Sequence, residues 1–352
     1  MMEELIRRWD GEHLVVRYDR ETAAWVFIAV HSSRLGPASG GTRMKQYGAP
    51  EEGLRDAQRL AAGMTYKWAA ADFPQGGGKG VIALSRPLQD DERERLLERY
   101  GELVESLGGS FGTGADLGVG PDLVEVIGRR TKYVYGLRQA GDPGPWTALG
   151  VFTAMQALAA ELFGSADLKG RTVAVQGTGA AGLPLCKRLV SAGAGLKIAD
   201  LDGARVKAIA EELGATLVEA DAIYDEECDI FAPCAVGGVL NSGTIPRLRC
   251  KGIAGSANNQ LESPADAEAL HRRGILYAPD FVNNAGGAIA LCGMEALGMD
   301  EDAVAQKILG IRGSLEEIFQ EARENDESPL YAAEARARRV LVRGVTSLTP
   351  PA

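Results

Sequence analysis

Residues 172–182 read Thr-Val-Ala-Val-Gln-Gly-Thr-Gly-Ala-Ala-Gly, an apolar run that leads into a glycine-rich turn. The glycines follow the spacing Gly-x-Gly-x-x-Gly over 177–182, and a helical stretch runs from 183 to 192. The next apolar run, 196–199, ends at Asp200, 18 residues past the last glycine. This order of strand, loop, helix, strand and acid predicts a Rossmann dinucleotide-binding domain, since it supplies the context that a bare glycine motif lacks.

Each glycine of this motif has its own task in a dinucleotide-binding fold. Gly177 permits the sharp turn, Gly179 lets the backbone approach a pyrophosphate, and Gly182 packs the helix on the strand. The pyrophosphate would lie at the helix N-terminus, and Asp200 would accept hydrogen bonds from the adenosine ribose hydroxyls. An acid at that place favours NAD over NADP, and Asp202 remains a second candidate for the role.

Helical and extended stretches alternate after this motif. They lie at 204–213, 215–217, 229–231 and 252–254. The alternation predicts an α/β fold with a doubly wound parallel sheet, in which ligands bind at the carboxyl ends of the strands. Three loops there carry small or amide side chains, namely 233–235, 257–259 and 283–287. We interpret Cys234 in the first loop as a packing residue rather than a nucleophile, because no histidine stands near it in sequence.

The remaining elements follow from residue periodicity. Alternating apolar residues predict a hairpin, and apolar residues three and four apart predict helices. The expected hairpin strands are 13–18 and 24–30, the expected helices are 51–70, 90–107, 147–163 and 316–343, and a tight loop is expected over 35–43. The breaker-rich run 141–146 is interpreted as a domain boundary.

The stretch Gly76-Gly77-Gly78-Lys79-Gly80 predicts a second functional segment. We interpret it as a packed glycine turn that leads into a strand over 81–84, with Lys79 held away from water. Burial lowers the pKa of a lysine and suits it to act as a general base. A flexible surface loop with a solvated lysine is the alternative. A phosphate-binding loop is excluded, because Gly80 stands where that motif requires Ser or Thr.

Two other candidates have equally ordinary alternatives. Asp116 lies in the glycine-rich run 108–118, where an aspartate is usually a turn residue, but it would also supply a carboxylate beside Lys79. Lys67 lies in the predicted helix 51–70, where an exposed lysine is the common case.

Composition limits the classes of function. The chain has 352 residues, room for two domains, and a net charge of −10, so we expect no nucleic-acid partner. Its acidic N-terminus is not a signal peptide, and we expect no membrane span and no membrane partner. Five scattered cysteines favour free thiols in a reducing cytoplasm. Three distant histidines offer little for a metal site or a catalytic triad, so no metal is expected.

The motifs together resemble the glutamate/leucine/phenylalanine/valine dehydrogenase family over nearly the whole chain. In the first half the matching motifs are Gly40-Gly41-Thr42-Arg43, Met64-Thr65-Tyr66-Lys67, Gly76-Gly77-Gly78-Lys79 and Thr113-x-x-Asp116. In the second half they are Gly177 to Gly182, Pro233-Cys234-Ala235, Ala254 to Gln260 and Asn284-Ala285-Gly286-Gly287. The resemblance implies NAD-dependent, reversible oxidative deamination of an L-amino acid to its 2-oxo acid, with release of ammonia, by a homo-oligomer of two to eight subunits.

The resemblance also implies residue roles. Lys79 activates the water that attacks the imine, Asp116 exchanges protons with the substrate nitrogen, and Lys67 pairs with the substrate carboxylate. Repulsion between the two lysines would help to lower the pKa of Lys79. The implied substrate-binding residues are Lys67, Gly41, Ser39, Met64, Gly114, Asn284, Ala288 and Leu291. The implied cofactor-binding residues are Thr147, Gly177, Thr178, Gly179, Ala180, Ala181, Gly182, Asp200, Cys234, Ala235, Ala257, Asn258 and Asn284.

Four of these positions are expected to line the side-chain pocket, namely Ser39, Gly114, Ala288 and Leu291. By this resemblance, glutamate-specific members have a lysine where Ser39 stands; without that cation a buried substrate carboxylate would be unpaired here, so glutamate is disfavoured. Small residues at Ser39, Gly114 and Ala288 favour a large apolar side chain, most of all L-phenylalanine, with leucine, valine or tryptophan as alternatives. Ala115 and Val119 depart from the family pattern around Asp116, which usually has an acid and a threonine there.

The expected organisation is an α/β amino-acid-binding and catalytic domain over 1–143 and a Rossmann NAD domain over 144–325. A helical tail over 326–352 is expected to pack back on the first domain. A nucleotide-binding protein without catalysis is the alternative from another class, and the family spacing of Lys67, Lys79 and Asp116 argues against it.

Overall fold

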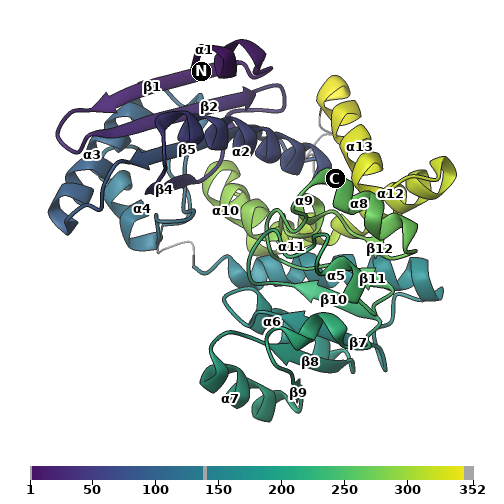
Figure 1. Ribbon diagram of the computed structural model, residues 1–352. Helices are drawn as coiled ribbons and strands as arrows, with labels where there is room; N and C mark the ends of the chain where they lie inside the picture. The colour runs from purple at the N-terminus through teal and green to yellow at the C-terminus, as the bar shows by residue number, and fades with distance from the viewer. Residues whose placement is uncertain (1, 138–140, 345–352) are drawn as a thin grey trace. The chain divides into compact units, whose positions relative to one another are not determined.

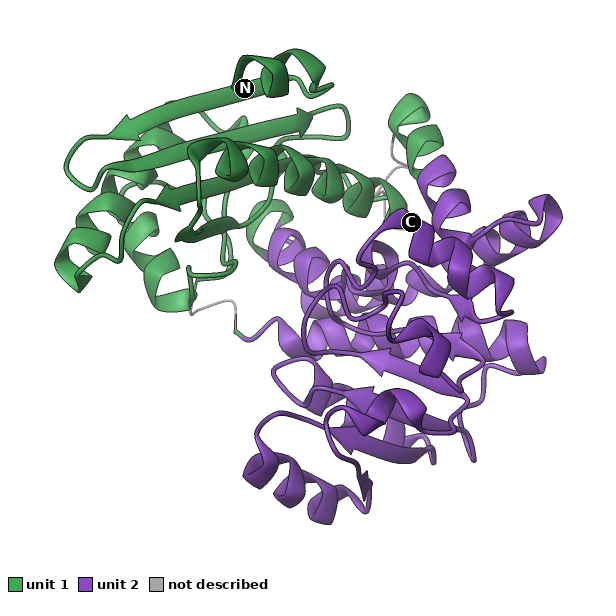
Figure 2. Ribbon diagram, in the orientation of Figure 1, with its two compact units in different colours: residues 1–141, 295–297, 337–352 green, residues 142–294, 298–336 purple. Residues whose placement is uncertain are grey.

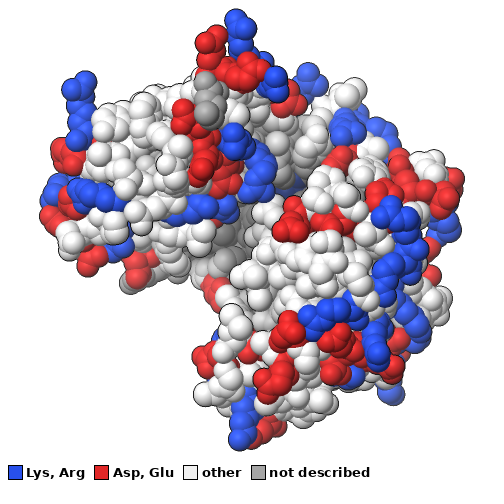
Figure 3. All heavy atoms as spheres, in the orientation of Figure 1, with Lys and Arg blue, Asp and Glu red and all other residues white. Residues whose placement is uncertain are grey.

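The computed structural model describes residues 2–137 and 141–344, as two α/β units (Figure 1). Unit 1 comprises Met1–Gly141, Glu295–Leu297 and Ala337–Ala352, and unit 2 comprises Asp142–Met294 and Gly298–Arg336 (Figure 2). On the face drawn in Figure 3, basic and acidic side chains are interspersed over the surface of each unit. The two-unit α/β organisation agrees with the fold class predicted from the sequence.

Unit 1 is built on a six-stranded mixed sheet of order β1-β2-β5-β3-β6, with β4 also paired to β5. The strands are β1 (His13–Asp19), β2 (Ala24–Ser32), β3 (Ala38–Ser39), β4 (Thr42–Gln46), β5 (Gly76–Leu84) and β6 (Phe111–Gly112). The antiparallel pair β1 and β2 confirms the predicted hairpin. β3 and β4 both run parallel to β5, so part of the expected loop over 35–43 is extended and paired.

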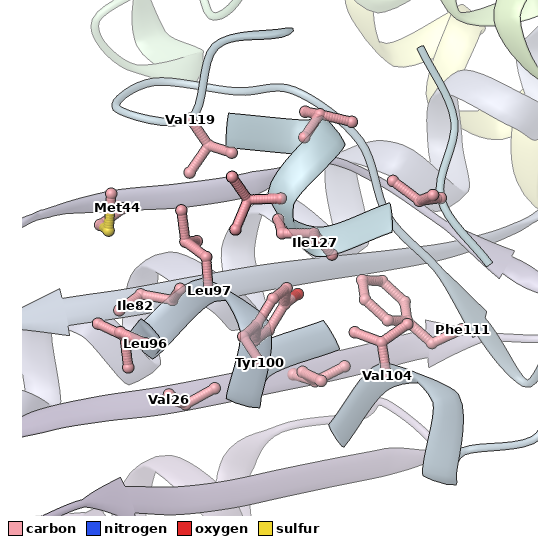
Figure 4. Close-up of a cluster of buried hydrophobic side chains, with 14 of the residues drawn as sticks. Val26, Met44, Ile82, Leu96, Leu97, Tyr100, Val104, Phe111, Val119 and Ile127 are labelled. Carbon is pink, nitrogen blue, oxygen red and sulfur yellow. The ribbon is translucent and has the colours of Figure 1, made fainter. Parts of the chain in front are cut away.

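Helices cover both faces of this sheet. They are α1 (Met2–Arg8), α2 (Pro50–Ala70), α3 (Asp90–Ser106) and α4 (Pro121–Gly128), of which α2 and α3 confirm predicted helices. Phe27 and Val81 belong to the apolar cluster beneath α2. Val26 and Ile82 belong to the opposite cluster with α3 and α4 (Figure 4). Alternate side chains of β2 and β5 therefore face opposite helical layers, as the two-residue period of a strand requires.

The glycine run of unit 1 is a strand, not the turn expected from the sequence. Residues 76–80 open β5, which lies between β2 on one side and β3 and β4 on the other. None of these glycines has a positive φ. A Cβ at Gly77 would lie 2.0 Å from Thr65 Oγ1 of α2, and one at Gly80 would lie 2.1 Å from Tyr100 Oη of α3. Close packing on both faces therefore explains the glycines.

Unit 2 holds a six-stranded parallel sheet of order β12-β11-β10-β7-β8-β9. Its strands are β7 (Thr172–Gln176), β8 (Gly195–Ala199), β9 (Thr216–Leu217), β10 (Ile230–Pro233), β11 (Gly252–Ile253) and β12 (Leu276–Tyr277). Renumbered within the unit this is the order 3-2-1-4-5-6 of a Rossmann fold, which confirms the predicted doubly wound sheet. Its switch point lies between β7 and β10, the place where such sheets bind ligands.

The helices of unit 2 surround this sheet. They are α5 (Gly144–Phe163), α6 (Gly182–Ser191), α7 (Gly203–Leu213), α8 (Pro264–Arg272), α9 (Asp280–Asn283), α10 (Gly286–Leu297), α11 (Glu301–Leu309), α12 (Ile311–Asn325) and α13 (Pro329–Arg343), with short 3₁₀ turns at Ala222–Asp225 and Ile245–Arg247. The ends of α10 and α13 belong to unit 1. By length and composition α5 would be long and apolar enough to cross a membrane, a stretch that the sequence analysis did not single out. Its contacts with α6, α11 and α12 identify it as a core helix.

The charged tail is helical as predicted, but it forms two helices rather than one. Asp326 ends α12 in the left-handed conformation with φ of 51°, and α13 begins at Pro329. Within unit 1, Ala337 and Val340 of α13 lie in one buried cluster with Leu35 and Ala69. The last part of the expected tail, 345–352, lies outside the described residues.

Candidate active site

Lys79 lies in the middle of β5 with its side chain on the α2 face of the sheet. The alternation that turns Gly80 towards α3 and Val81 towards α2 fixes this direction. The Lys79 side chain is only 6% exposed, and its Nζ forms an ion pair with Asp116 Oδ2. The solvated-loop alternative for Lys79 is therefore wrong.

Asp116 begins a tight two-residue turn that the local sequence dictates. Its backbone N–H donates to Val119 O at 3.2 Å, and the N–H of Val119 donates back at 2.9 Å. Gly118 stands third in this turn with φ of 78°, as a type II turn requires. The Thr42 N–H donates to Gly114 O and the Met44 N–H to Leu117 O, so the turn runs along β4.

Arg43 of β4 completes a chain of alternating charges that the sequence alone did not predict. Its Nε lies 3.1 Å from Asp116 Oδ1, and its Nη1 lies 3.0 Å from Asp56 Oδ2 of α2. Asp56 also accepts hydrogen bonds from Tyr47 Oη at 2.7 Å and from Arg59 Nη2 at 2.8 Å. The arrangement holds two carboxylates around one half-buried guanidinium.

These contacts set the protonation of the pair. Burial lowers the pKa of Lys79, and the nearby Arg43 charge acts in the same direction, although Asp116 opposes both. Burial alone would raise the pKa of Asp116, but the charges of Lys79 and Arg43 outweigh it and lower that pKa to about 2. Asp116 is therefore a carboxylate at neutral pH, next to a lysine that gives up its proton more readily than a solvated one.

The implied substrate residues of unit 1 lie on elements around this pair. Lys67 is half-buried in the last turn of α2, where a cation also interacts favourably with the helix dipole. Met64 lies one turn earlier on the same helix, and Ser39 is buried in β3. A Cβ at Gly41 would lie 2.2 Å from Ala115 O, so this glycine lets β4 approach the turn that carries Asp116.

Gly114 and Val119 have structural explanations of their own. A Cβ at Gly114 would lie 2.9 Å from Tyr135 O, closer than a real side chain tolerates. Its small size is therefore required by the backbone of residues 113–135 and does not by itself measure the room for a substrate. Val119, one of the departures from the family pattern, is fully buried in the apolar cluster with α3 and α4 (Figure 4).

The glycine loop of unit 2 fits a dinucleotide. Gly177 has φ of 95°, and a Cβ at Gly182 would lie 2.1 Å from Gly177 O. At Gly179 an added Cβ would meet nothing within 4 Å, so this part of the loop is open. Ala181, the N-cap of α6, supplies no side-chain hydrogen bond to the helix end. A helix N-terminus behind an open glycine suits a pyrophosphate.

Asp200 reaches back from the end of β8 to this loop. Its Oδ2 accepts hydrogen bonds from Thr178 N at 2.7 Å, Thr178 Oγ1 at 2.9 Å and Arg205 Nη2 at 2.8 Å. Burial would raise the pKa of Asp200, but these donors lower it to about 2. Asp202 instead caps α7 by accepting from Arg205 N at 3.0 Å. Of the two candidate acids, Asp200 is thus the one joined to the glycine loop.

The other implied cofactor residues follow strands of the same sheet. The Ser256 N–H donates to Cys234 Sγ at 3.5 Å, and burial raises the pKa of this thiol, which favours a packing role over a nucleophile. Ala235 packs on Gly177. Ala180 and Ala181 complete the glycine loop, and Ala257 lies in the segment between β11 and α8.

The side-chain amide of Asn284 is hydrogen-bonded through its nitrogen alone, as far as the described residues show. Its Nδ2 donates to Asn258 Oδ1 at 3.0 Å and to Ala257 O at 3.2 Å, while its Oδ1 is buried and unsatisfied among the described residues. The glycines that follow it pack on α5, because a Cβ at Gly287 would lie 2.4 Å from Thr147 Oγ1. Thr147, Asn258 and Asn284 thus gather in one region of unit 2. An orphaned buried acceptor there suits an amide donor such as that of a nicotinamide.

Ala288 and Leu291 lie three apart on α10, as the sequence predicted. Both are half-buried, although their neighbours Gly287, Ile289 and Ala290 are buried. They therefore share one accessible face of the helix.

Sequence reasoning thus identified the residues of the charged pair but missed their surroundings. Arg43 belongs to the motif Gly40-Gly41-Thr42-Arg43. No local sequence pattern singles out Asp56, Tyr47 or Arg205. Their partners lie on other elements, so contacts across the fold determine their importance.

Comparisons with known proteins identify the family of this chain. Residues 14–133 match the family described as Glu/Leu/Phe/Val dehydrogenase, dimerisation domain, and residues 196–343 match Glutamate/Leucine/Phenylalanine/Valine dehydrogenase. The chain is 43% identical over 332 residues to leucine dehydrogenase of Geobacillus stearothermophilus, with 93% of this chain and 89% of that protein covered. It is 40% identical over 339 residues to phenylalanine dehydrogenase of Lysinibacillus sphaericus, with 94% and 88% covered.

A solved structure gives the same result. The crystal structure of L-tryptophan dehydrogenase from Nostoc punctiforme matches with a TM-score of 0.86 at 40% identity, over 97% of this chain and 98% of that one. The matches span both units and agree with a nicotinamide cofactor at the Rossmann sheet. The chain therefore belongs to the glutamate/leucine/phenylalanine/valine dehydrogenase family, whose members are amino acid oxidoreductases.

Proposed function

We propose that this protein catalyses the NAD-dependent, reversible oxidative deamination of an apolar L-amino acid, with L-phenylalanine preferred. The observation that carries the proposal is the buried ion pair of Lys79 and Asp116. A lysine that is 6% exposed and a carboxylate on an adjoining turn form a proton-transfer pair shielded from bulk water.

In this proposal the residues divide the reaction between them. Lys67 holds the substrate carboxylate as a point charge. Asp116 accepts a proton from the substrate ammonium, so that the free amine can lose hydride from its Cα and become an iminium. Lys79 in its neutral form then takes a proton from the water that attacks the iminium carbon, which gives a carbinolamine. Asp116 returns its proton to the amino nitrogen, the C–N bond breaks to release ammonia, and the hydroxyl proton passes to solvent as the 2-oxo acid forms.

NAD, when bound, supplies the hydride acceptor. The open Gly179 and the N-terminus of α6 would hold its pyrophosphate, and Asp200 would hold its adenosine ribose. Asn258, Asn284 and Thr147 would orient the nicotinamide amide. The carboxylate of Asp200 favours NAD over NADP, because a 2′-phosphate would be repelled by it.

The choice of amino acid depends on the side-chain pocket. Gly114 is explained by its contact with Tyr135 O, so the preference for a large side chain depends on Ser39, Ala288 and Leu291. The relatives named for leucine, phenylalanine and tryptophan are similar to this chain to nearly the same degree. Leucine, valine and tryptophan are therefore the alternatives, and glutamate is disfavoured for want of a cation at Ser39.

The test is NADH formation with L-phenylalanine, leucine, valine, tryptophan and glutamate in parallel at alkaline pH. We expect the highest kcat/KM with phenylalanine. A leucine or tryptophan preference would keep the mechanism and overturn our interpretation of the pocket. Binding of NADH without turnover of any of the five would favour a non-catalytic nucleotide-binding protein instead.

The cysteines and the family match bear on the cellular compartment and the oligomeric state. All five cysteines are free, which favours a reducing, cytoplasmic compartment. The match of residues 14–133 to a domain described by dimerisation supports a homo-oligomer. Size-exclusion chromatography with light scattering would measure the number of subunits.

A further inference from the structure

Arg43 joins the catalytic pair to the helix α2. Its side chain is 17% exposed, and its guanidinium lies between two carboxylates, with Nε towards Asp116 and Nη1 towards Asp56. A guanidinium is planar and has fixed donor directions, so two such contacts determine its orientation. Lysine in the same place would offer one charged atom for both carboxylates.

The Asp116 carboxylate has a separate donor set on each oxygen. Lys79 Nζ pairs with Oδ2, while Arg43 Nε and the Leu117 N–H donate to Oδ1. The carboxylate plane is therefore fixed from both ends, and Oδ2 is directed at Lys79. A proton that moves between Lys79 and Asp116 depends on this alignment.

The position of Arg43 is itself determined by its neighbours. The Asp56 carboxylate accepts hydrogen bonds from Arg43, Tyr47 and Arg59. Tyr47 lies in the segment between β4 and α2. Next to Arg43, the Thr42 hydroxyl bonds to Tyr100 Oη at 2.7 Å and to Thr113 Oγ1 on the opposite face of the sheet. β4 is thus held on both faces at Thr42 and Arg43, which lie beside the turn that carries Asp116.

We propose that Arg43 is a positioning residue for Lys79 and Asp116, and that Asp56 is the anchor that holds Arg43 in place. This inference depends on the proposed function, because it assigns Arg43 to the same reaction. Arg43 itself acts through Asp116 and is not a catalytic residue.

The charges that face this pair predict opposite effects of two substitutions. The largest charges that act on Lys79 are Asp116 on the turn, Arg43 on β4 and Asp56 on α2, and Lys67 of α2 is the same in every variant compared. Tyr47 and Arg59 face Asp56, and burial raises the pKa of Tyr100 on α3 to about 12, so it stays neutral. Arg43 disfavours the charged form of Lys79 and Asp56 favours it.

The experiment compares Arg43→Gln with Asp56→Asn in the full-length enzyme. Removal of the Arg43 cation should raise the pKa of Lys79. The increase of kcat/KM with pH should therefore occur at a pH roughly one unit higher than in the wild type. Asp56→Asn removes an anion and should move the same limb downwards by a smaller amount. Loss of alignment should also lower kcat about 10- to 100-fold in Arg43→Gln.

Arg43→Lys and Arg59→Gln complete the set. Arg43→Lys keeps the positive charge but loses the planar set of N–H donors. The increase of kcat/KM should therefore occur near the same pH as in the wild type, while kcat remains low. Arg59 pairs with the same Asp56 from a more exposed position, so Arg59→Gln should change kcat less than twofold. Thermal unfolding of each variant separates loss of fold from loss of alignment, and Arg43→Lys with Asp56→Asn suffices if Arg43→Gln does not fold.

Labelling of Lys79 gives a readout that does not need turnover. Acetylation by acetic anhydride over a range of pH, quantified on the Lys79 peptide by mass spectrometry, reports the pKa of that amine directly. Opposite shifts in Arg43→Gln and Asp56→Asn support the inference even if the wild type deaminates none of the amino acids tested, which would refute only the proposed function. Equal pH limbs and wild-type kcat in folded Arg43→Gln would overturn the inference.

Discussion

The two glycine-rich segments of this protein have similar compositions and opposite structural reasons. Gly76–Gly80 is part of a central strand, has no positive φ and is enclosed by Thr65 and Tyr100 on its two faces. Gly177–Gly182 is a loop in which Gly177 has a positive φ, and a Cβ added at Gly179 would have no neighbouring atom within 4 Å. The first segment needs glycine to be buried, and the second needs it to stay open.

The two glycine segments also contribute different chemical groups. The unit 1 segment carries an ionisable side chain, Lys79, and its packing excludes water from that amine. The unit 2 segment has only Thr178 and alanines between its glycines, and it offers backbone to a ligand. Substitutions in unit 1 should therefore affect catalysis and folding, whereas those in unit 2 should affect binding of the cofactor.

The largest effect is expected from Lys79→Ala. Loss of the general base should lower kcat about 10³-fold or more, within the usual range for such groups. Because the nucleotide site of unit 2 remains intact, the NADH dissociation constant from fluorescence titration should be unchanged. Lys132→Ala, which removes an exposed lysine of unit 1, is the control. Turnover near the wild-type rate would remove Lys79 from the mechanism.

Gly77→Ala should show that the unit 1 glycines serve packing. Its Cβ would lie 2.0 Å from Thr65 Oγ1 and 2.2 Å from Thr65 N, so the free energy of unfolding should fall by about 3 kcal/mol. Gly63→Ala on α2 is the matched control, because its Cβ meets nothing and should stabilise the helix by about 0.5–1 kcal/mol. Urea unfolding of both variants measures the difference, and equal stabilities would contradict the packing explanation.

Gly179→Ala should show the reverse behaviour in unit 2. The added methyl group meets no protein atom within 4 Å, so stability should change little, while NADH binding should weaken roughly 10- to 50-fold through contact with the pyrophosphate. Gly203→Ala at the start of α7, where the Cβ also meets nothing, is expected to bind normally. Calorimetric titration with NADH measures both. Unchanged affinity in Gly179→Ala would place the pyrophosphate elsewhere.

The smallest effect concerns the choice between the two dinucleotides. Asp200→Ala should weaken NADH more than NADPH and change their affinity ratio about tenfold, because it removes a carboxylate and leaves Arg205 available to a phosphate. Asp202→Ala should cost about 1 kcal/mol of stability through loss of the α7 cap and leave the ratio unchanged. The opposite pattern in these titrations would transfer the role to Asp202.

Local sequence predicted the parts of this molecule that depend on local rules. The strand–glycine–helix order around residue 177 and the helical period of α2 and α3 gave the correct elements. Residues 76–80 were misinterpreted as a turn, because strand glycines are explained by neighbours such as Thr65 and Tyr100 that come from distant segments. The end of α12 at Asp326 was not predicted, because the residue in the left-handed conformation there is not a glycine.

The candidate site follows the same division. Lys79 and Asp116 were identified through the family resemblance, and their ion pair spans 37 residues of sequence. Arg43 and Asp56 were not linked in advance, because their contact depends on how β4 lies beside α2. Sequence patterns thus identified the two residues of the charged pair, and tertiary packing determined their protonation.

Transfer of deuterium from substrate to cofactor tests the central claim most directly. The wild-type enzyme would be supplied with L-phenylalanine deuterated at Cα together with NAD, and the reduced cofactor analysed by mass spectrometry. We predict NADH that carries one deuterium, because the hydride leaves the substrate Cα for the nicotinamide. Unlabelled NADH, or no reduction with phenylalanine or any other apolar amino acid, would contradict the account.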